Sequence, residues 1–450
     1  MDRQRVLEFF EGNKDFFENT VEENIEKYRK GDLTLHIVDK DGNAVDGVEV
    51  KIKQRSHEFR FGANLFMLDE LETEEKNRLY KEHFKTTFNM ATLPFYWSTC
   101  EPRKGEKRYA KDSKKWYRRP PIDLCMEFCQ ANNIEPREHA FAYERQFPEW
   151  LWGKSTDEVK RELEIRFEEM AKMYGDKIRT IEVTNEMLWS HNDGRTEFYN
   201  QRDYIEWCFK LAEKYFPKNQ LVINEYTEAC WGDNCRATDR YYAYIEANKL
   251  KGAKIDAIGF QYHMFYKKED EYEKAKFLYH PRHLYDHMDL YSDLADTLQV
   301  TEITLPAYSN APEDEEIQAR LLEYLYTLWF SHPKMEQIIY WNLVDGYAYV
   351  ESPTPEEIRR TQGNMEIGEN YYYGGLLRFD MSPKPAFLAL KKLIEEKWHT
   401  ELDSATNTEG RVCFRGFYGD YEIEIKVAGK TVSKQISHSK NGVGDITLTI

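Results

Sequence analysis

Short strand-like runs alternate with helical patterns through the middle of this chain, and that alternation limits the fold more than any other feature. Runs rich in β-branched and aromatic residues predict eight strands, at residues 59–63, 86–91, 135–142, 178–184, 220–224, 256–261, 298–302 and 337–341. Apolar residues at helical spacing predict eight helices, at residues 70–83, 120–132, 156–174, 201–215, 236–250, 282–295, 313–330 and 384–397. Eight strands alternating with eight helices over roughly 340 residues indicate an α/β chain folded as a (β/α)8 TIM barrel.

A doubly wound open sheet is the alternative to a barrel. Folds of that kind usually carry a glycine-rich phosphate-binding loop after the first strand. No such loop follows residues 59–63. The barrel is therefore the preferred prediction.

The two ends of the chain carry period-two patterns instead. Residues 33–38 and 48–52 alternate on either side of a turn at 41–43, which predicts a β-hairpin. The same alternation returns at residues 411–414, 419–427 and 446–450. Because an isolated hairpin is marginally stable in water, we expect the two ends to pack together as one small β-sandwich. The predicted organisation is a leading helix at 1–30, a discontinuous sandwich at 31–56 and 400–450, and a catalytic barrel at 57–399.

Composition excludes several classes of partner. The net charge of −17 argues against binding to nucleic acid. No apolar run approaches the roughly 20 residues of a membrane span. The first residues lack the apolar core of a signal peptide, so the sequence as it stands predicts a cytoplasmic protein, or a secreted one if a leader has been lost. The seven cysteines lack metal-site spacing and are expected to be reduced thiols, and the sequence does not indicate an oligomeric state.

Polar side chains stand at or just after the ends of six predicted strands. In a barrel of this kind the active site lies at the C-terminal ends of the strands. The residues found there are His139, Tyr143, Asn185, Glu186, Asn224, Glu225, Gln261, His263, Glu302, Trp341 and Asp345. Each of them alone is more often an ordinary hydrogen-bonding or solvated residue, but their convergence on one rim predicts a site. Two carboxylates on strands of one barrel, Glu186 and Glu302, are the minimum equipment for hydrolysis of a glycosidic bond.

Several motifs around these residues resemble glycoside hydrolase family 10, the family of endo-β-1,4-xylanases. Thr184-Asn185-Glu186 is similar to the V-N-E segment of that family, and Thr301-Glu302 is similar to its T-E segment. Residues 139–151 follow its H-x-x-x-W-H-x-Q-x-P-x-W-L stretch, residues 261–263 its Q-x-H, Trp341 the start of its W-G-V-x-D, and residues 375–387 its closing segment. The resemblance covers about residues 57–397, with the motifs in the same order and spacing.

This resemblance implies hydrolysis with retention by double displacement. Glu302 would be the nucleophile and Glu186 the general acid/base, with their carboxyl groups about 5–5.5 Å apart. The resemblance also implies a polysaccharide or oligosaccharide substrate, with neither a cofactor nor a metal ion. The expected substrate-binding residues are His139, Asn185, Gln261, His263, Trp341, Tyr143, Glu144, Tyr96 and Trp97.

The sequence departs from the family on one side of the site. Three polar residues that grip xylose in the family align with Thr92, Leu93 and Tyr96, and the W-H pair of the third strand is Tyr143-Glu144. The changes spare the catalytic pair and alter the sugar-binding walls. The predicted function is therefore a retaining endo-acting β-glycanase for β-1,4-xylan or a decorated xylan. The alternatives are the same barrel acting on a different, possibly acidic, β-glycan or as an exo-glycosidase, and a non-catalytic carbohydrate-binding protein.

One further feature lies in the loop after the second predicted strand. Residues 103–119 hold nine lysines and arginines in an otherwise acidic protein. Such a run attracts an acidic glycan if it faces the site, and it is an ordinary solvated loop if it does not.

Overall fold

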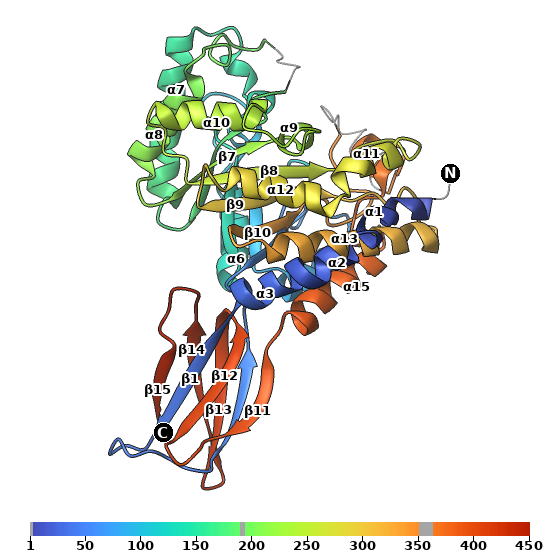
Figure 1. The fold of residues 1–450 in the computed structure, drawn as a ribbon. Helices are drawn as coiled ribbons and strands as arrows, with labels where there is room; N and C mark the ends of the chain where they lie inside the picture. The colour runs from blue at the N-terminus through green and yellow to red at the C-terminus, as the bar shows by residue number, and fades with distance from the viewer. Residues whose placement is uncertain (1–2, 190–193, 351–362) are drawn as a thin grey trace.

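The centre of the protein is a closed barrel of eight parallel strands, surrounded by helices (Figure 1). The computed structural model describes residues 3–189, 194–350 and 363–450. Around the barrel the strands are ordered β10-β3-β4-β5-β6-β7-β8-β9, which follows their order in the chain. Their bounds are β3 (Arg60–Asn64), β4 (Met90–Pro94), β5 (Glu135–His139), β6 (Thr180–Asn185), β7 (Gln220–Glu225), β8 (Ala257–His263), β9 (Thr297–Thr304) and β10 (Met335–Tyr340). The predicted TIM barrel is thereby confirmed.

The barrel strands are buried on both faces, because helices cover the outer face and side chains fill the interior. Every residue of β6 is buried, and β9 is buried after its first residue. The eight predicted helices are all present, as α4 (Glu74–Thr87), α6 (Ile122–Ala131), α7 (Thr156–Tyr174), α8 (Tyr204–Tyr215), α10 (Arg240–Leu250), α12 (Pro281–Tyr291), α13 (Pro312–Ser331) and α15 (Pro385–Lys392). The prediction for α7 is correct at both ends, and this helix begins with a capping box between Ser155 and Glu158.

Short helices fill several loops of the barrel. They are α5 (Trp97–Cys100), η3 (Glu144–Gln146), η4 (Glu149–Leu151), α9 (Thr227–Cys230), α11 (Glu271–Leu278), η5 (Gly368–Tyr372) and η6 (Leu393–Lys397). Among the described residues, every helix is too short or too polar to cross a bilayer.

The leading segment is broken rather than one helix. Its elements are η1 (Arg3–Leu7), α1 (Glu8–Glu11), α2 (Lys14–Phe16), η2 (Phe17–Val21) and α3 (Glu22–Arg29). The segment packs against α13, where the ring of Phe10 stacks on Tyr324 at 4.8 Å. At its end the buried guanidinium of Arg29 donates to the backbone carbonyl oxygens of Phe330, His332 and Met335 at 2.5, 2.5 and 2.8 Å. These contacts fix the segment to the barrel.

The two chain ends form a separate β-sandwich, at the bottom of Figure 1. One sheet has the order β12 (Arg411–Phe417), β1 (Lys30–Val38), β15 (Asp445–Thr449). The other has the order β11 (Glu401–Ala405), β2 (Glu49–Gln54), β13 (Gly419–Val427), β14 (Lys430–His438). Apolar side chains from both sheets meet in their own core, distinct from that of the barrel. The predicted sandwich of N- and C-terminal segments is present, while the proposed domain limits stay a prediction.

The predicted hairpin of residues 33–38 and 48–52 is wrong. β1 pairs with β12 and β15, and β2 pairs with β11 and β13, so the two strands lie in opposite sheets. Each strand turns alternate side chains into the core between the sheets, which produces the same period-two pattern as a hairpin. β11 and β14 were not predicted, because their side chains are mostly exposed and polar.

The sandwich adjoins the end of the barrel where the strands begin. Asn89, just before β4, and Asn133, just before β5, line one hollow together with Gln54 and Tyr421 of the sandwich. The opposite rim, where the barrel strands end, is therefore not covered by the sandwich.

Candidate active site

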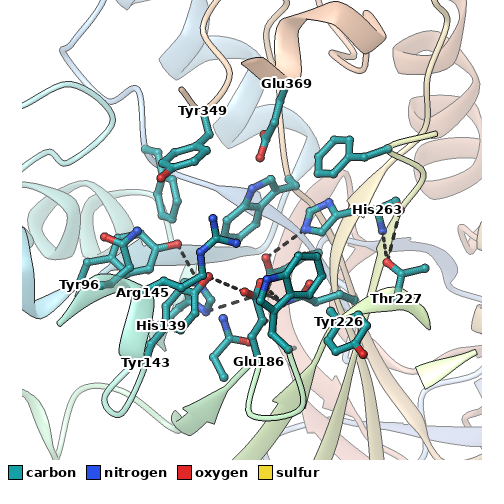
Figure 2. Close-up of a pocket in the computed structure, with 18 of the residues that line it drawn as sticks. Tyr96, His139, Tyr143, Arg145, Glu186, Tyr226, Thr227, His263, Tyr349 and Glu369 are labelled. Carbon is teal, nitrogen blue, oxygen red and sulfur yellow. Dashed lines mark hydrogen bonds and ion pairs between the residues drawn. The ribbon is translucent and has the colours of Figure 1, made fainter. Parts of the chain in front are cut away.

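A cavity of about 350 Å³ opens at the C-terminal ends of the barrel strands. Figure 2 shows Tyr96, His139 and Tyr143 along one side and His263, Tyr226 and Thr227 along the other, with Glu186 between the two sides. Nine side chains expected from the sequence as catalytic or binding residues line this cavity, namely Tyr96, His139, Tyr143, Asn185, Glu186, Gln261, His263, Glu302 and Trp341.

The two carboxylates are joined through one amide group. Gln261 Nε2 donates to Oε1 of Glu186 and to Oε1 of Glu302, at 3.1 Å in each case. The two carboxylate oxygens therefore cannot be farther apart than twice that distance. This limit agrees with the carboxyl separation of about 5–5.5 Å in retaining glycosidases and falls short of the roughly 6.5–9.5 Å in inverting ones.

Glu302 is buried at the end of β9 and accepts hydrogen bonds on both oxygens. Asn224 Nδ2 donates to Oε1 at 2.9 Å, and His263 Nε2 lies 3.2 Å from Oε2. Burial lowers the pKa of His263, which favours a neutral ring. Because an ionised carboxylate only accepts, Nε2 carries the proton, and Nδ1 then accepts from the hydroxyl of Thr304 at 3.0 Å.

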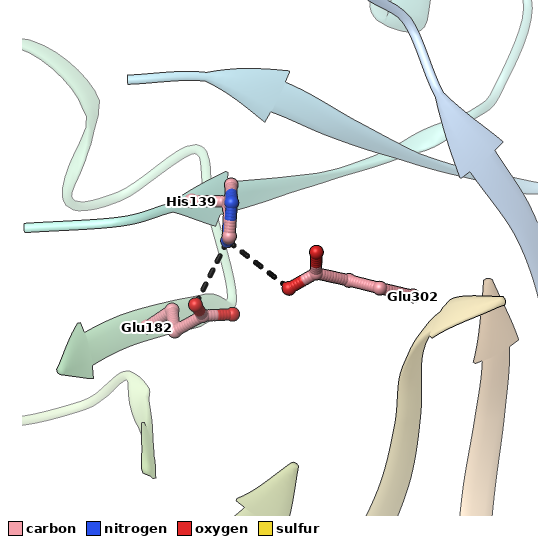
Figure 3. A group of neighbouring side chains, drawn as sticks. All are labelled: His139, Glu182 and Glu302. Carbon is pink, nitrogen blue, oxygen red and sulfur yellow. Dashed lines mark hydrogen bonds and ion pairs between the residues drawn. The ribbon is translucent and has the colours of Figure 1, made fainter. Parts of the chain in front are cut away.

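The charge on Glu302 is set by its surroundings. Burial raises the pKa of Glu302 to about 8. The electrostatic effect of His139 lowers this pKa, and the negative charges of Glu182 and Glu186 raise it further. Figure 3 shows His139 between the two carboxylates, with Nδ1 at 2.8 Å from Glu182 and 4.0 Å from Glu302. This histidine links the cavity to a charge cluster inside the barrel.

That cluster is an ion pair between Arg137 of β5 and Glu182 of β6, both fully buried. The pair and His139 hold the pKa of Glu182 below its usual value, against the effect of burial. Ligand atoms of His139, Glu182 and Glu302 lie within 4.8 Å of one another, a spacing that a metal ion can use. Protein donors already occupy the oxygens involved, since Asn224 Nδ2 reaches both Glu182 Oε1 at 3.3 Å and Glu302 Oε1. The residues fit a hydrogen-bonded relay better than a metal centre.

Glu186 follows the last residue of β6 and has a left-handed backbone with φ of 52°. That conformation turns the chain at the rim, and the hydroxyl of Tyr143 donates to Oε2 of Glu186 at 2.6 Å. Glu225 supports the turn from below by accepting from the backbone N–H of Leu188 at 2.9 Å. Burial raises the pKa of Glu225 to about 8. Glu225 is thus a support for the loop and does not line the cavity.

An aromatic wall faces the two carboxylates. Phe66, Tyr96 and Trp341 form a small apolar cluster, with Tyr143 packed against it. The hydroxyl of Tyr96 lies 2.8 Å from Nε2 of His139, which fixes the tyrosine beside the end of β5. Flat aromatic faces at this position suit the apolar faces of a sugar ring.

Two of the expected binding residues do not lie in this cavity. Trp97 is 2% exposed and packs edge-on against Phe147 and Trp150 in the barrel core, because the short helix α5 begins there and turns it inward while Tyr96 keeps the cavity position. Glu144 lies in η3 and borders a small separate hollow of about 30 Å³, which Tyr143, Asn185 and Glu186 also line. Trp97 and Glu144 thus lie outside this cavity, and their role in substrate binding stays a prediction.

The sequence also missed several cavity residues. Phe66 and Phe265 each stand two residues beyond a barrel strand, and Thr227 and Glu228 stand two and three residues beyond β7, so a wider window at the strand ends would have found them. Glu369 comes from the long loop after β10, where no local pattern marks it, and Tyr349 of the same loop also lines the cavity. Residues 351–362 of the loop after β10 lie outside the described residues.

The basic run of residues 103–119 divides into two parts. Most of its cations pair with carboxylates or carbonyl groups on the surface, such as Lys104 with Glu162 at 2.5 Å and Lys111 with Glu127 at 3.1 Å. Arg118 and Arg119, at its end, reach the cavity and line it. The solvated-loop interpretation therefore holds for the surface cations such as Lys104 and Lys111, and it fails for Arg118 and Arg119.

The protein is a parallel eight-stranded barrel with two facing carboxylates and an aromatic wall at its C-terminal rim, which is the arrangement of a glycosidase. The chain belongs to glycosyl hydrolase family 10, whose family model matches residues 55–391. This range agrees closely with the resemblance seen in the sequence motifs.

Individual relatives are distant. Endo-1,4-beta-xylanase 2 of Arabidopsis thaliana is 22% identical over 460 residues, which take in 100% of this chain and 36% of the relative. Anti-sigma-I factor RsgI6 of Acetivibrio thermocellus is 22% identical over 437 residues, 95% of this chain and 49% of the relative. Endo-1,4-beta-xylanase B of Thermotoga neapolitana is 24% identical over 349 residues, 75% of this chain and 88% of the relative. The chain thus spans less than half the length of the first two relatives.

Solved structures agree in fold. Native xylanase 10B from Thermotoga maritima superposes with a TM-score of 0.58 at 20% identity, covering 76% of this chain and 96% of that one. Xylanase 10B from Thermotoga petrophila RKU-1, crystallised in complex with xylobiose, superposes with a TM-score of 0.56 at 21% identity, covering 76% of this chain and 95% of that one. At these identities the likeness establishes the barrel alone.

Proposed function

We propose that this chain is a retaining endo-β-glycanase that hydrolyses β-1,4-xylan or a decorated xylan by double displacement. Glu302 is the nucleophile and Glu186 the general acid/base. The observation that carries the proposal is the single amide nitrogen of Gln261, 3.1 Å from an oxygen of each carboxylate. The names of the xylanase relatives support xylan as the polymer.

In the first step the ionised carboxylate of Glu302 attacks the anomeric carbon of the bound sugar. Glu186 gives its proton to the leaving glycosidic oxygen, so the bond between sugar and leaving chain breaks as the bond to Glu302 forms. The N–H donors of Asn224, Gln261 and His263 hold the oxygens of Glu302 in place. A fixed carboxylate reaches the carbon with little reorganisation.

In the second step water replaces the leaving chain. Glu186, now ionised, takes a proton from that water, which attacks the anomeric carbon and releases Glu302. The hydroxyl of Tyr143, 2.6 Å from Oε2 of Glu186, stabilises the negative charge that Glu186 carries in this step. Two inversions at one carbon leave the product with the configuration of the substrate.

The remaining polar residues position the reacting sugar. Oδ1 of Asn185 accepts from Nδ2 of Asn224 at 3.0 Å and lies 3.2 Å from Nε2 of Gln261, which leaves the Nδ2 group of Asn185 to donate to the 2-hydroxyl of the sugar. That contact strengthens in the transition state. His139 and Trp341 line the same sugar position from the aromatic side.

The alternatives concern the substrate more than the chemistry. Thr92 is fully buried in the barrel and Leu93 is in its core, so the family's polar grip on xylose has no counterpart at these positions. This observation favours a different or acidic β-glycan, or exo action, as the second candidate. A non-catalytic role is less favoured because both carboxylates keep their hydrogen-bond donors.

A substrate panel with product analysis tests the proposal. Plain xylan, uronic-acid-decorated xylan and other β-glycans are incubated with the protein, and the products are separated by size. Endo action predicts a ladder of oligosaccharides from a xylan at early times, whereas exo action releases one short product. Failure to cleave any β-glycan would overturn the proposal.

A further inference from the structure

Among the described residues, two buried arginines in the cavity wall have no carboxylate partner. Arg118 and Arg119 are 3% and 6% exposed. In the described part of the chain neither guanidinium makes an ion pair: Arg118 Nη1 donates to the backbone oxygen of Tyr347 at 2.6 Å, and Arg119 Nη1 donates to the backbone oxygen of Arg118 at 2.8 Å. The Nε group of Arg118 is buried and donates to no described residue. A buried cation without a counter-ion is costly to keep, so an arrangement of this kind points to an anion that binds there.

The other cations of the same loop differ in this respect. Lys107, for example, pairs with Glu101 at 3.1 Å and with Glu169 at 2.6 Å. Arg108 is also buried, but its Nε, Nη1 and Nη2 groups all donate to backbone oxygens, and it lines neither of the two cavities that Arg118 and Arg119 line.

Their position places them beside the reacting sugar rather than on it. Arg119 lies over the ring of Tyr96 at 4.1 Å, and the hydroxyl of Tyr96 is bonded to His139, which in turn lies 4.0 Å from Glu302. Arg118 and Arg119 also line a second cavity of about 370 Å³, bordered by the exposed rings of Trp116 and Trp152. Both arginines also line the first cavity together with Glu186 and Glu302, so a glycan bound at the catalytic residues occupies the same cavity as the arginines.

We propose that Arg118 and Arg119 form a subsite for the carboxylate of a uronic acid unit in the glycan, one sugar position away from the site of cleavage. The inference rests on the proposed function and names its substrate class, an acidic β-glycan. A planar guanidinium pairs with a carboxylate through two parallel hydrogen bonds. The neutral residues Thr92, Leu93 and Tyr96, where the family resemblance implies a polar grip on xylose, leave this recognition to the arginines.

The test compares matched substrates. The first pair is a xylo-oligosaccharide with a glucuronic acid branch and the same compound with its carboxyl group reduced to an alcohol. The second pair is an oligosaccharide with a uronic acid in its main chain and its reduced form. The pair that shows the larger acid preference identifies the source of the carboxylate.

The variants are Arg119→Met, which keeps the aliphatic stem over Tyr96, and Arg119→Lys, which keeps the charge. Lys111→Met in the same loop is the control. We expect the wild type to prefer an acidic substrate over its reduced form at least about 10-fold in kcat/KM. Arg119→Met should abolish most of that ratio, Arg119→Lys should keep part of it, and Lys111→Met should keep all of it.

Binding is measured in parallel by calorimetry on Glu302→Ala with the same four compounds. Equal kcat/KM for acidic and reduced substrates, or a ratio that survives Arg119→Met, overturns the subsite while leaving the glycanase proposal intact. If no compound is cleaved, the glycanase proposal fails. The subsite is then tested by calorimetry alone. Glu302→Ala should bind the acidic compounds more tightly than their reduced forms, and the double variant Glu302→Ala/Arg119→Met should lose this preference. If Glu302→Ala shows no such preference, the subsite proposal is overturned.

Discussion

Asn224 Nδ2 donates to Oε1 of Glu302 at 2.9 Å, across the barrel interior from the end of β7 to the end of β9. The amide cannot turn over freely, because its Oδ1 accepts from the hydroxyl of Thr301 at 2.7 Å. Asn224 is fully buried and so gives a fixed donor to the proposed nucleophile. This contact orients one oxygen of Glu302 and leaves Oε2 to His263.

Asn224→Ala should therefore lower kcat by about 10²-fold, since a removed donor to a charged transition-state group commonly costs that much. Steady-state kinetics on the best substrate of the panel measures the loss. Thr301→Val is the graded control, because it removes only the group that orients the amide, and a loss of about 10-fold or less is expected there. An Asn224→Ala variant with wild-type kcat would contradict the role given to this contact.

The two carboxylates should respond differently to removal. Glu302→Ala should abolish turnover of every glycoside, because no covalent intermediate can form. Glu186→Ala should keep the first step for aryl glycosides with good leaving groups and should regain turnover in azide, which needs no base. Burst kinetics with an aryl glycoside separates the two steps. Rescue of Glu302→Ala on activated substrates with retention would reverse the assignment.

The pH profile should carry the mark of the buried cluster. Burial raises the pKa of Glu302, and its reactive form is the ionised one, so the acid limb of a bell-shaped kcat/KM profile should lie above the usual range of a glutamate, since the general acid must still hold its proton at higher pH. Glu182→Gln removes a negative neighbour and leaves Arg137 unpaired, and both changes favour the ionised form of Glu302. The acid limb should then move to lower pH by about one unit or more.

Glu138→Gln is the matched control for this shift. Glu138 is also buried on β5 and accepts from the backbone N–H of Glu182 at 2.9 Å, a bond that a glutamine oxygen can keep. Burial raises the pKa of Glu138 well above its usual value, so the neutral glutamine changes little charge there. Its replacement should leave the acid limb in place. An unchanged acid limb in Glu182→Gln would show that the cluster does not set the charge on Glu302.

The leading segment should contribute measurably to stability through Arg29. Its guanidinium serves three carbonyl groups and lies over the rings of Phe59 and Phe330 at 4.7 and 5.2 Å. Arg29→Met leaves those carbonyls without their donor and should lower the Tm by about 5 °C or more. Calorimetry measures the change against Arg78→Met, whose partner Glu75 is on the surface. Equal Tm values for the two variants would contradict this prediction.

The barrel was predictable from the sequence because its strands are short β-branched runs and its helices have clear apolar faces. The least accurate strand was β4, expected at 86–91 and found at Met90–Pro94, because α4 continues to Thr87 before the chain extends. The hairpin failed for a different reason: alternation reports which face of a strand is buried and says nothing about which strand lies beside it.

Within the candidate site, the sequence predicted the residues at strand ends correctly, but it did not predict residues whose position depends on the conformation of a loop. Glu186, Gln261 and Glu302 follow directly from strand ends, whereas only Tyr96 of the neighbouring pair Tyr96 and Trp97 lines the cavity, because a four-residue helix begins at Trp97. The unpaired state of Arg119 was beyond the sequence, because pairing depends on which carboxylates the fold brings near. A basic run in the sequence shows the charges but not their partners.

The central claim is retention through a covalent intermediate on Glu302, and the configuration of the first product tests it most directly. A β-linked xylo-oligosaccharide, or the best acidic substrate of the panel, is hydrolysed inside an NMR tube and the new anomeric proton signal is followed before mutarotation. The β anomer should appear first, with the α anomer growing in afterwards. Initial formation of the α anomer would mean inversion and would contradict the assignment of Glu302 as a nucleophile.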